Sequence, residues 1–185
     1  MAERILLVLD LDETLIHARE AELDYAPDFR VLNYSVYKRP GLDDFLVKCA
    51  AMFELAVWSA GENDYVRAIV EQIVPKHIEL QFVWSRERCT IRRDFDTGGY
   101  YPAKDLQKVR RRGRLLKRIL IIDDEPIKLR KNYGNAIYVR PFEGGRIDSE
   151  LDLLSAYLKT ISLSDDVRSI EKRGWRESSL KNRGV

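Results

Sequence analysis

The sequence "ILLVLDLDETLIHARE", residues 5–20, joins an apolar run to a group of acidic side chains. Residues 5–9 are all aliphatic, and Asp10, Asp12 and Glu13 follow within four positions. A short apolar run that ends in a polar turn is typical of a strand buried on both faces, as in a parallel sheet. The carboxylates therefore stand where such a strand ends, and clustered negative charge at this place calls for a chemical explanation.

Further apolar runs of the same kind recur along the chain and alternate with helical patterns. The runs are "FELAVW" 53–58, "RILII" 118–122 and, more weakly, "NAIYV" 135–139. Apolar side chains follow the helical period in residues 41–52, 63–74 and 148–161. This alternation predicts an α/β fold with a parallel central sheet flanked by helices. Residues 17–38 and 85–103 are turn-rich, and we expect loops or small β-insertions there.

The length and composition predict one globular domain. The chain has 185 residues, of which 45% are hydrophobic, enough for one buried core. We expect residues 1–162 to form this domain and residues 163–185 to add a C-terminal helix and tail, with Trp175 docked on the core. No apolar stretch approaches the roughly 20 residues of a membrane span, so we expect no membrane insertion.

Charge and cysteine content bear on partners and location. The net charge of +2 is small, so no stable binding of nucleic acid is expected. The basic block "KVRRRGRLLKR", residues 108–118, is either a solvated helix end and loop or a surface that attracts acidic macromolecules. Cys49 and Cys89 lie forty positions apart without metal-ligand spacing. They indicate no disulfide framework and a cytoplasmic location.

Polar side chains stand near the ends of several predicted strands. In a parallel α/β sheet, ligands bind beyond the carboxyl ends of the strands, which meet at one edge. We expect side chains from four separate parts of the sequence to converge there. They are Asp10, Asp12, Ser59, Lys104, Asp123 and Asp124.

These residue types suit phosphoryl transfer. A carboxylate can attack a phosphoryl group and form an aspartyl phosphate, but it is a weak nucleophile that faces an anion. It needs a hard cation such as Mg²⁺ with oxygen ligands, and it needs donors for the phosphoryl oxygens. A second carboxylic acid can protonate the leaving group and later activate water. The residues available for these roles, in order, are Asp10, Asp124, Ser59, Lys104 and Asp12.

The same motifs resemble a known family. "DLDETL", Ser59, Lys104 and "DDEP", in this order, resemble the haloacid dehalogenase (HAD) superfamily of phosphatases. "VYKRPGLDDFL", "VWSAG", "AKDL" and "IIDDEP" are similar to its Fcp/Scp, or NIF-type, group, which dephosphorylates serine or threonine in the RNA polymerase II C-terminal domain (CTD). "VWSA" and "VRPFEG…ELDLLSAYL" look nearest to the branch with a ubiquitin-like domain. The resemblance covers most of residues 3–160 and implies a Rossmann-like HAD fold.

The resemblance also implies roles for individual residues. Asp10 would be the nucleophile and Asp12 the general acid/base. The Asp10 side chain, the Asp12 backbone carbonyl and Asp124 would hold Mg²⁺. The residues implied to contact the phosphoryl group or substrate are Ser59, Lys104 and Arg86, the last in "WSRERC". Other members have Asp-Asn where this chain has Asp123 and Asp124, so either acid could be the metal ligand, with Asp124 preferred.

Together these features predict a Mg²⁺-dependent phosphatase that acts on phosphoserine or phosphothreonine in proteins. The segment between "DLDET" and "RPGL" is too short for a cap domain of about 50 residues, and an open site suits a large substrate. A phosphatase of small metabolites or nucleic-acid ends is the alternative. A phospho-receiver would lack a general acid/base such as Asp12 next to the phosphorylated residue. A catalytically dead phosphopeptide-binding module would usually lack one of these acids.

Overall fold

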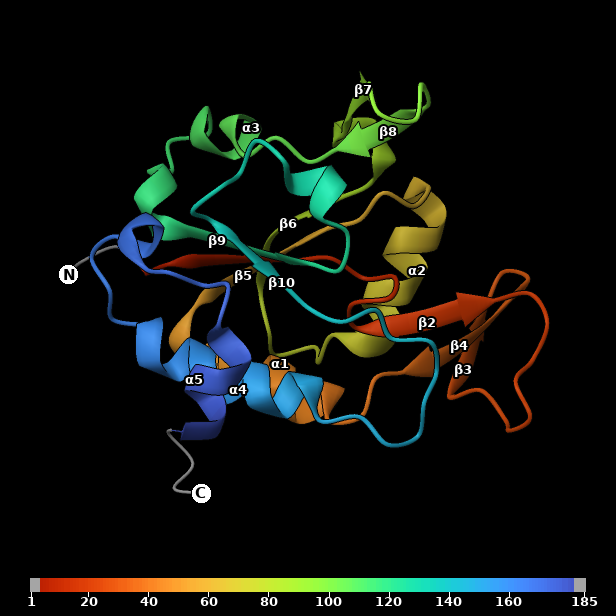
Figure 1. The fold of residues 1–185 in the computed structure, drawn as a ribbon. Coiled ribbons are helices and arrows are strands. Elements are labelled where there is room, and N and C mark those ends of the chain that lie inside the picture. The colour runs from red at the N-terminus through yellow and green to blue at the C-terminus, as the bar shows by residue number, and fades with distance from the viewer. Residues whose placement is uncertain (1–3, 182–185) are drawn as a thin grey trace.

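A computed structural model describes residues 4–181, and a parallel five-stranded sheet forms the centre of this part of the chain (Figure 1). The strand order is β10-β9-β1-β5-β6. The strands are β1 (Leu6–Leu9), β5 (Glu54–Trp58), β6 (Leu80–Trp84), β9 (Ile119–Asp123) and β10 (Ala136–Tyr138). The strands expected around residues 5–9, 53–58, 118–122 and 135–139 are thereby confirmed.

Strand β1 lies in the middle of the sheet, and its four residues are all buried. Leu9 is in register with Val57 of β5 on one side and with Ile122 of β9 on the other. The three strands therefore end at the same level, and the residues that follow them are neighbours in space. Strand β6 was not predicted, because exposed Gln81 interrupts its apolar run at the edge of the sheet.

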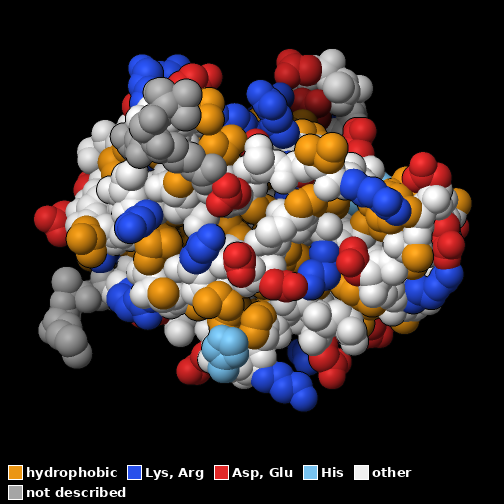
Figure 2. Space-filling view, turned by 90° about the horizontal axis from the view of Figure 1, so that it is seen from below, with side chains coloured by type: hydrophobic (Ala, Val, Ile, Leu, Met, Phe, Trp, Pro, Cys, Tyr) orange, Lys and Arg blue, Asp and Glu red, His pale blue; other side chains and the backbone are white. Residues whose placement is uncertain are grey.

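Helices cover both faces of the sheet, which explains why its strands are continuous apolar runs. They are α1 (Leu42–Met52), α2 (Asn63–Ile73), α3 (Gln107–Arg110), α4 (Glu150–Ile161) and α5 (Trp175–Lys181). In Figure 1, α3 lies above the sheet, and α1, α4 and α5 lie below it. Figure 2 shows the lower face from outside, where charges of both signs lie among scattered hydrophobic side chains. No helix within residues 4–181 combines the length and hydropathy that a membrane crossing needs.

Two small antiparallel units decorate the central sheet where β-insertions were expected. The strands of the first are β2 (Ile16–Arg19), β3 (Phe29–Val31) and β4 (Tyr34–Lys38), in the order β2-β4-β3. The second is the hairpin of β7 (Thr90–Arg93) and β8 (Tyr100–Ala103). The first unit extends to the right in Figure 1. The fold class predicted from the sequence, an α/β sheet with small β-insertions, is confirmed.

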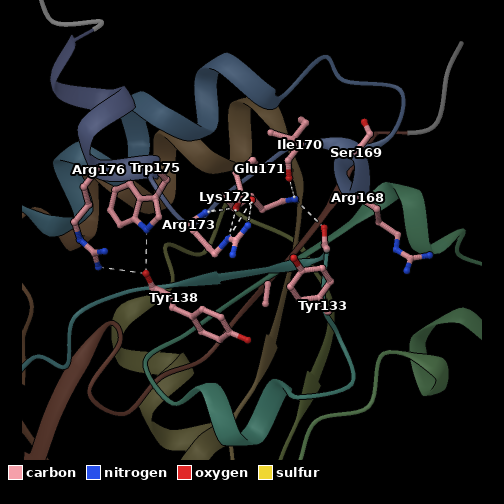
Figure 3. A pocket seen from close by; sticks show the side chains of 12 residues that line it. Tyr133, Tyr138, Arg168, Ser169, Ile170, Glu171, Lys172, Arg173, Trp175 and Arg176 are labelled. Carbon is pink, nitrogen blue, oxygen red and sulfur yellow. Dashed lines mark hydrogen bonds and ion pairs between the residues drawn. The ribbon is translucent and has the colours of Figure 1, made fainter.

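The C-terminal segment covers the edge strand β10. Trp175 is buried, as expected, and its Nε1 donates to the Tyr138 carbonyl at 3.0 Å. The Lys172 ammonium donates to the carbonyls of Gly134 and Ile170, each at 2.8 Å. A cavity of about 300 Å³ remains between this segment and β10 (Figure 3). We propose that residues 163–181 belong to the same domain; residues 182–185 of the expected tail lie outside the described residues.

Candidate active site

The side chains at the carboxyl ends of β1, β5 and β9 are positioned by continued strand hydrogen bonding. The Asp10 N–H donates to the Ile122 carbonyl at 3.1 Å, and the Ser59 N–H donates to the Trp84 carbonyl at 2.9 Å. Asp123 is the last residue of β9. Because these three residues still follow the sheet, their side chains have defined directions, and all three are buried.

Lys104 joins two of the aspartates. Its side chain is completely buried, and its Nζ lies 2.6 Å from Asp10 Oδ1 and 2.6 Å from Asp123 Oδ2. Burial acts to lower the pKa of Lys104, but the charges of Asp10 and Asp123 outweigh it and raise this pKa. Lys104 is therefore a cation at neutral pH, held beside the expected nucleophile.

Asp12 has different partners from those of Asp10. Ser59 Oγ donates to Asp12 Oδ2 at 3.2 Å, and the Tyr65 hydroxyl donates to Asp12 Oδ1. Burial and the charge of Asp10 raise the pKa of Asp12, and the two hydrogen bonds offset this only in part. Two carboxylates two positions apart thus have separate environments: Asp10 faces an ammonium, and Asp12 faces hydroxyl groups.

The contact of Tyr65 with Asp12 was not predicted. The helical period of α2 indicates only that Tyr65 packs against the core or its rim, and it is indeed mostly buried. Gly61 lets it approach: a Cβ there would lie 2.9 Å from Tyr65 Cδ1 and 3.2 Å from Ser59 Oγ. The Gly61 N–H also donates to Ser59 Oγ at 2.9 Å. A glycine two residues after the serine was the available sequence signal.

The acid pair after β9 meets Asp10 in a cluster suited to a metal ion. Carboxylate oxygens of Asp10, Asp123 and Asp124 lie within 4.8 Å of one another. Both oxygens of Asp123 are engaged, Oδ2 by Lys104 and Oδ1 by the Glu125 N–H at 2.9 Å. Burial and the charge of Asp10 raise the pKa of Asp124 to about 7. An all-oxygen set that repels itself fits Mg²⁺, and the engagement of Asp123 favours Asp124 as the ligand.

Thr14 and Arg39 brace the turn that carries Asp10 and Asp12. Thr14 Oγ1 lies 3.5 Å from Asp10 Oδ2 and 3.5 Å from Asp124 Oδ1. The buried Arg39 guanidinium donates to the Thr14 carbonyl at 3.0 Å and to both oxygens of Asp148 at 3.1 and 2.9 Å. Such a bidentate pair has a defined geometry, so Arg39 ties this turn to the segment that precedes α4.

Arg86 lies near the site but not on the acid cluster. Its Nε donates to the Ala60 carbonyl at 2.8 Å, and its NH1 lies 3.0 Å from Glu62 Oε1. It therefore holds the loop after Ser59, and its contact with substrate stays a prediction. Several cations of the basic block 108–118 bind groups of this chain; Arg114, for example, pairs with Glu54.

The fold and these side chains define the class of protein. Two aspartates follow one strand of the parallel sheet, a hydroxyl follows the next, and an acid pair stands at the end of β9 beside a buried lysine. These are the parts of a HAD-type phosphoryl-transfer site. The chain belongs to the family of NLI interacting factor-like (NIF) phosphatases, whose model matches residues 5–168. This membership confirms the family expected from the motifs and the enzyme class, a phosphoric monoester hydrolase.

Curated relatives have modest sequence identity. CTD small phosphatase-like protein 2 of Dictyostelium discoideum is 30% identical over 172 residues, covering 89% of this chain and 29% of that protein. The human carboxy-terminal domain RNA polymerase II polypeptide A small phosphatase 1 is 30% identical, and the match covers 91% of this chain and 64% of that protein. CTD nuclear envelope phosphatase 1B of Danio rerio is 30% identical, covering 96% and 75%. The chain thus spans less than two thirds of the first two relatives.

Solved structures support the fold. The fission yeast RNA polymerase II CTD phosphatase Fcp1, bound to beryllium fluoride, superposes with a TM-score of 0.57 at 19% identity. The alignment covers 97% of this chain and 50% of that structure. A second structure of Fcp1 gives a TM-score of 0.55 at 22% identity. At these identities the similarity concerns the fold, and it confirms the HAD fold expected from the sequence.

The expected cytoplasmic location is wrong. Several relatives, from Danio rerio, Xenopus tropicalis and Caenorhabditis elegans, are named CTD nuclear envelope phosphatase 1 or its homologue, which points to the nuclear envelope rather than to the plain cytoplasm. The error has a physical cause. Free thiols such as those of Cys49 and Cys89 indicate a reducing environment, and the cytoplasm and the nucleus share that property.

Proposed function

We propose that this chain is a Mg²⁺-dependent phosphatase that hydrolyses phosphoserine or phosphothreonine in proteins through an aspartyl phosphate on Asp10. One observation carries the proposal: Asp10 lies 2.6 Å from a buried lysine, while the second acid, Asp12, accepts hydrogen bonds from the hydroxyl groups of Ser59 and Tyr65. A nucleophile needs nearby positive charge to approach a phosphate, and a general acid needs a raised pKa.

The first half of the proposed reaction uses Asp10 as the nucleophile. An Asp10 carboxylate oxygen attacks phosphorus, and the bond to the serine or threonine oxygen breaks. Lys104 and Ser59 donate to the phosphoryl oxygens, where charge is held during transfer. Mg²⁺, held by Asp10, Asp124 and the Asp12 carbonyl, would neutralise negative charge on the phosphoryl group and the carboxylates when bound.

The second carboxyl group moves the protons. Because the pKa of Asp12 is raised, this side chain can carry a proton to the leaving alkoxide in the first half-reaction. The Asp12 carboxylate that remains can then take a proton from the water that attacks the aspartyl phosphate. The Tyr65 hydroxyl holds this carboxyl group in one orientation through both steps, whereas the single hydroxyl proton of Ser59, which bonds Asp12 before substrate binds, turns to a phosphoryl oxygen afterwards.

The small insertions and the relatives' names support the proposed substrate class. The β2-β4-β3 unit and the β7-β8 hairpin are too small to form a cap domain of about 50 residues. A phosphorylated side chain on a protein can therefore reach the sheet edge. The matched relatives are named as phosphatases of the RNA polymerase II CTD or of the nuclear envelope, which favours a phosphoprotein over a small metabolite.

A substrate panel tests this proposal. We expect phosphoserine and phosphothreonine peptides to give a kcat/KM at least about tenfold above that of small phosphorylated metabolites, because remote contacts of a large substrate contribute to transition-state binding. Activity should require Mg²⁺, disappear in EDTA and return when Mg²⁺ is added. Peptide hydrolysis near background, together with rapid turnover of one metabolite, would favour the metabolite phosphatase instead.

Tyr65→Phe tests the assignment of Asp12. The hydrogen bond from Tyr65 lowers the pKa of Asp12, so its removal raises this pKa. The second half-reaction needs the Asp12 carboxylate, so the acidic limb of the kcat profile should move to higher pH. A hydrogen bond to a charged group is worth about 1.5–3 kcal/mol. At pH values below the midpoint of the acidic limb, we therefore expect kcat to fall about tenfold. The measurement is kcat from pH 4 to 9.

Tyr34→Phe is the matched control. The rings of Tyr34 and Tyr65 pack edge to face with their centroids 5.4 Å apart. The control removes a hydroxyl from the same aromatic pair and leaves the Tyr65–Asp12 hydrogen bond in place. Its pH profile should follow that of the wild type. If the acidic limb stays in place in Tyr65→Phe, then Asp12 is not the group that titrates in the rate-limiting step.

A further inference from the structure

The acid cluster of the site is only partly balanced by Lys104. Asp10, Asp12, Asp123 and Asp124 bring four carboxyl groups to the sheet edge, and Lys104 contacts two of them. A phosphate dianion that approaches this edge meets strong like charge, which opposes binding. A bound Mg²⁺ would relieve part of this repulsion. A further cation that faces the cluster would relieve more of it and attract the substrate.

Lys128 occupies such a place. It lies in the short 3₁₀ helix η3 (Pro126–Leu129), which directly follows the acid pair. The Lys104 N–H donates to the Lys128 carbonyl at 2.9 Å, so the backbones of the two lysines are joined. The Lys128 N–H donates to the Glu125 carbonyl at 3.1 Å, and the Glu125 N–H binds Asp123. These bonds hold η3 against the site.

The ammonium of Lys128 lies between surface and buried acids. Its Nζ is 2.5 Å from Glu125 Oε1, and the Lys128 side chain is only 11% exposed, against 49% for Glu125. Burial acts to lower the pKa of Lys128, but Asp10 and Asp123 outweigh it and raise this pKa. In return, Lys128 acts to lower the pKa of Asp12, Asp123 and Asp124. Its field therefore reaches the whole cluster.

A surface ion pair alone does not account for this arrangement. Exposed pairs three residues apart contribute about 0–1 kcal/mol, whereas the Lys128 side chain is largely buried and its ammonium is also attracted by Asp10 and Asp123. We propose that Lys128 is a phosphate-binding residue of this site, which contacts the phosphoryl group from the η3 side while Lys104, the residue after β8, contacts it from the other. Glu125 holds the ammonium until substrate arrives. This inference rests on the proposed phosphatase function.

The proposal predicts effects of opposite sign for anions and cations. In Lys128→Met, inorganic phosphate should inhibit about tenfold more weakly, and KM for a phosphoserine peptide should rise similarly, because a charge-assisted bond is lost. Mg²⁺ should bind several-fold more tightly, because a like charge next to its ligands is gone. Mg²⁺ affinity is measured by titration calorimetry without substrate, and kcat should change less than KM.

Matched variants separate this role from a structural one. Lys131 is exposed in the same segment, and Lys131→Met should change neither affinity. Lys128→Arg should retain most of the phosphate affinity. Glu125→Gln releases the ammonium and should lower KM for the peptide; this variant still tests the proposal if Lys128→Met fails to fold. Unchanged phosphate inhibition, or weakening of phosphate and Mg²⁺ together, would overturn the proposal.

The same experiments distinguish this proposal from the proposed function. If the wild type hydrolyses no phosphopeptide, the proposed action on phosphoproteins fails, whereas calorimetry still compares the binding of phosphate and Mg²⁺ to the wild type and Lys128→Met. If the wild type is active and Lys128→Met matches it in phosphate inhibition, KM and Mg²⁺ affinity, then only the role of Lys128 is refuted.

Discussion

Asp10→Asn is expected to reduce phosphate release from p-nitrophenyl phosphate by at least about 10³-fold, because loss of a covalent nucleophile removes the main reaction path. Asparagine has nearly the shape of aspartate, so the side chain still fills its buried position beside Lys104. The measurement is the steady-state rate in Mg²⁺, with circular dichroism and a thermal melt to show that the fold is intact.

Asp44→Asn is the control for the loss of one carboxylate. Asp44 lies exposed on α1, where its Oδ2 is 4.0 Å from Lys48 Nζ, and it has no role in the proposed site. Its substitution should leave both rate and fold at wild-type values. Mg²⁺-dependent turnover by Asp10→Asn at a rate near that of the wild type would refute the aspartyl-phosphate mechanism, even if the chain remained a phosphatase.

Lys104→Met is expected to destabilise the fold strongly as well as to abolish activity. Asp10 and Asp123 are almost fully buried, and Lys104 is the cation between them. Removal of one partner from a buried charge network leaves uncompensated charge, which costs about 3–5 kcal/mol. The free energy of unfolding, measured by urea denaturation without Mg²⁺, should fall by about this amount. Lys48→Met, an exposed substitution, should have no comparable effect.

The pH dependence of this loss has a definite sign. Burial and the charge of Asp10 already raise the pKa of Asp123, and Lys104 opposes that rise. In Lys104→Met the native state therefore holds a proton that the unfolded state, with a pKa near 4, releases. The loss in free energy of unfolding, relative to the wild type, should be small below about pH 4 and grow as the pH rises through the raised pKa of Asp123.

Two comparisons test this explanation. Addition of Asp123→Asn to Lys104→Met removes one of the two carboxylates that repel each other and should restore part of the lost stability at pH 8. A deficit of equal size at pH 4 and pH 8 would show that Lys104 stabilises the fold by packing of its aliphatic chain rather than by its charge.

Much of the candidate site could be predicted because, in a parallel sheet, the residues that follow successive strands meet at one edge. The apolar runs that became β1, β5 and β9 marked three neighbouring strands, and residues just past parallel strands meet at one edge. The strand order alone therefore predicts that Asp10, Ser59 and Asp123 lie close together, as they do. Strand β6 was missed because an edge strand does not need a continuous apolar run.

Contacts that depend on side-chain direction could not be predicted in this way. Tyr65 and Asp12 are 53 positions apart, and helical periodicity places Tyr65 on a buried face without showing where its hydroxyl ends. Asp123 and Asp124 are adjacent and equivalent in the sequence; only the bonds of Asp123 to Lys104 and to the Glu125 N–H separate them. Lys128 appeared in no motif.

The sequence by itself determined the α/β class, the sheet edge and the two aspartates after β1, because burial of apolar strands and the order of parallel strands are encoded locally. The tertiary structure alone decided which groups share charge and protons: Lys104 between Asp10 and Asp123, Tyr65 on Asp12, and Lys128 beside the cluster. These interactions depend on distances of a few ångströms between segments remote in sequence, which only the packed core sets.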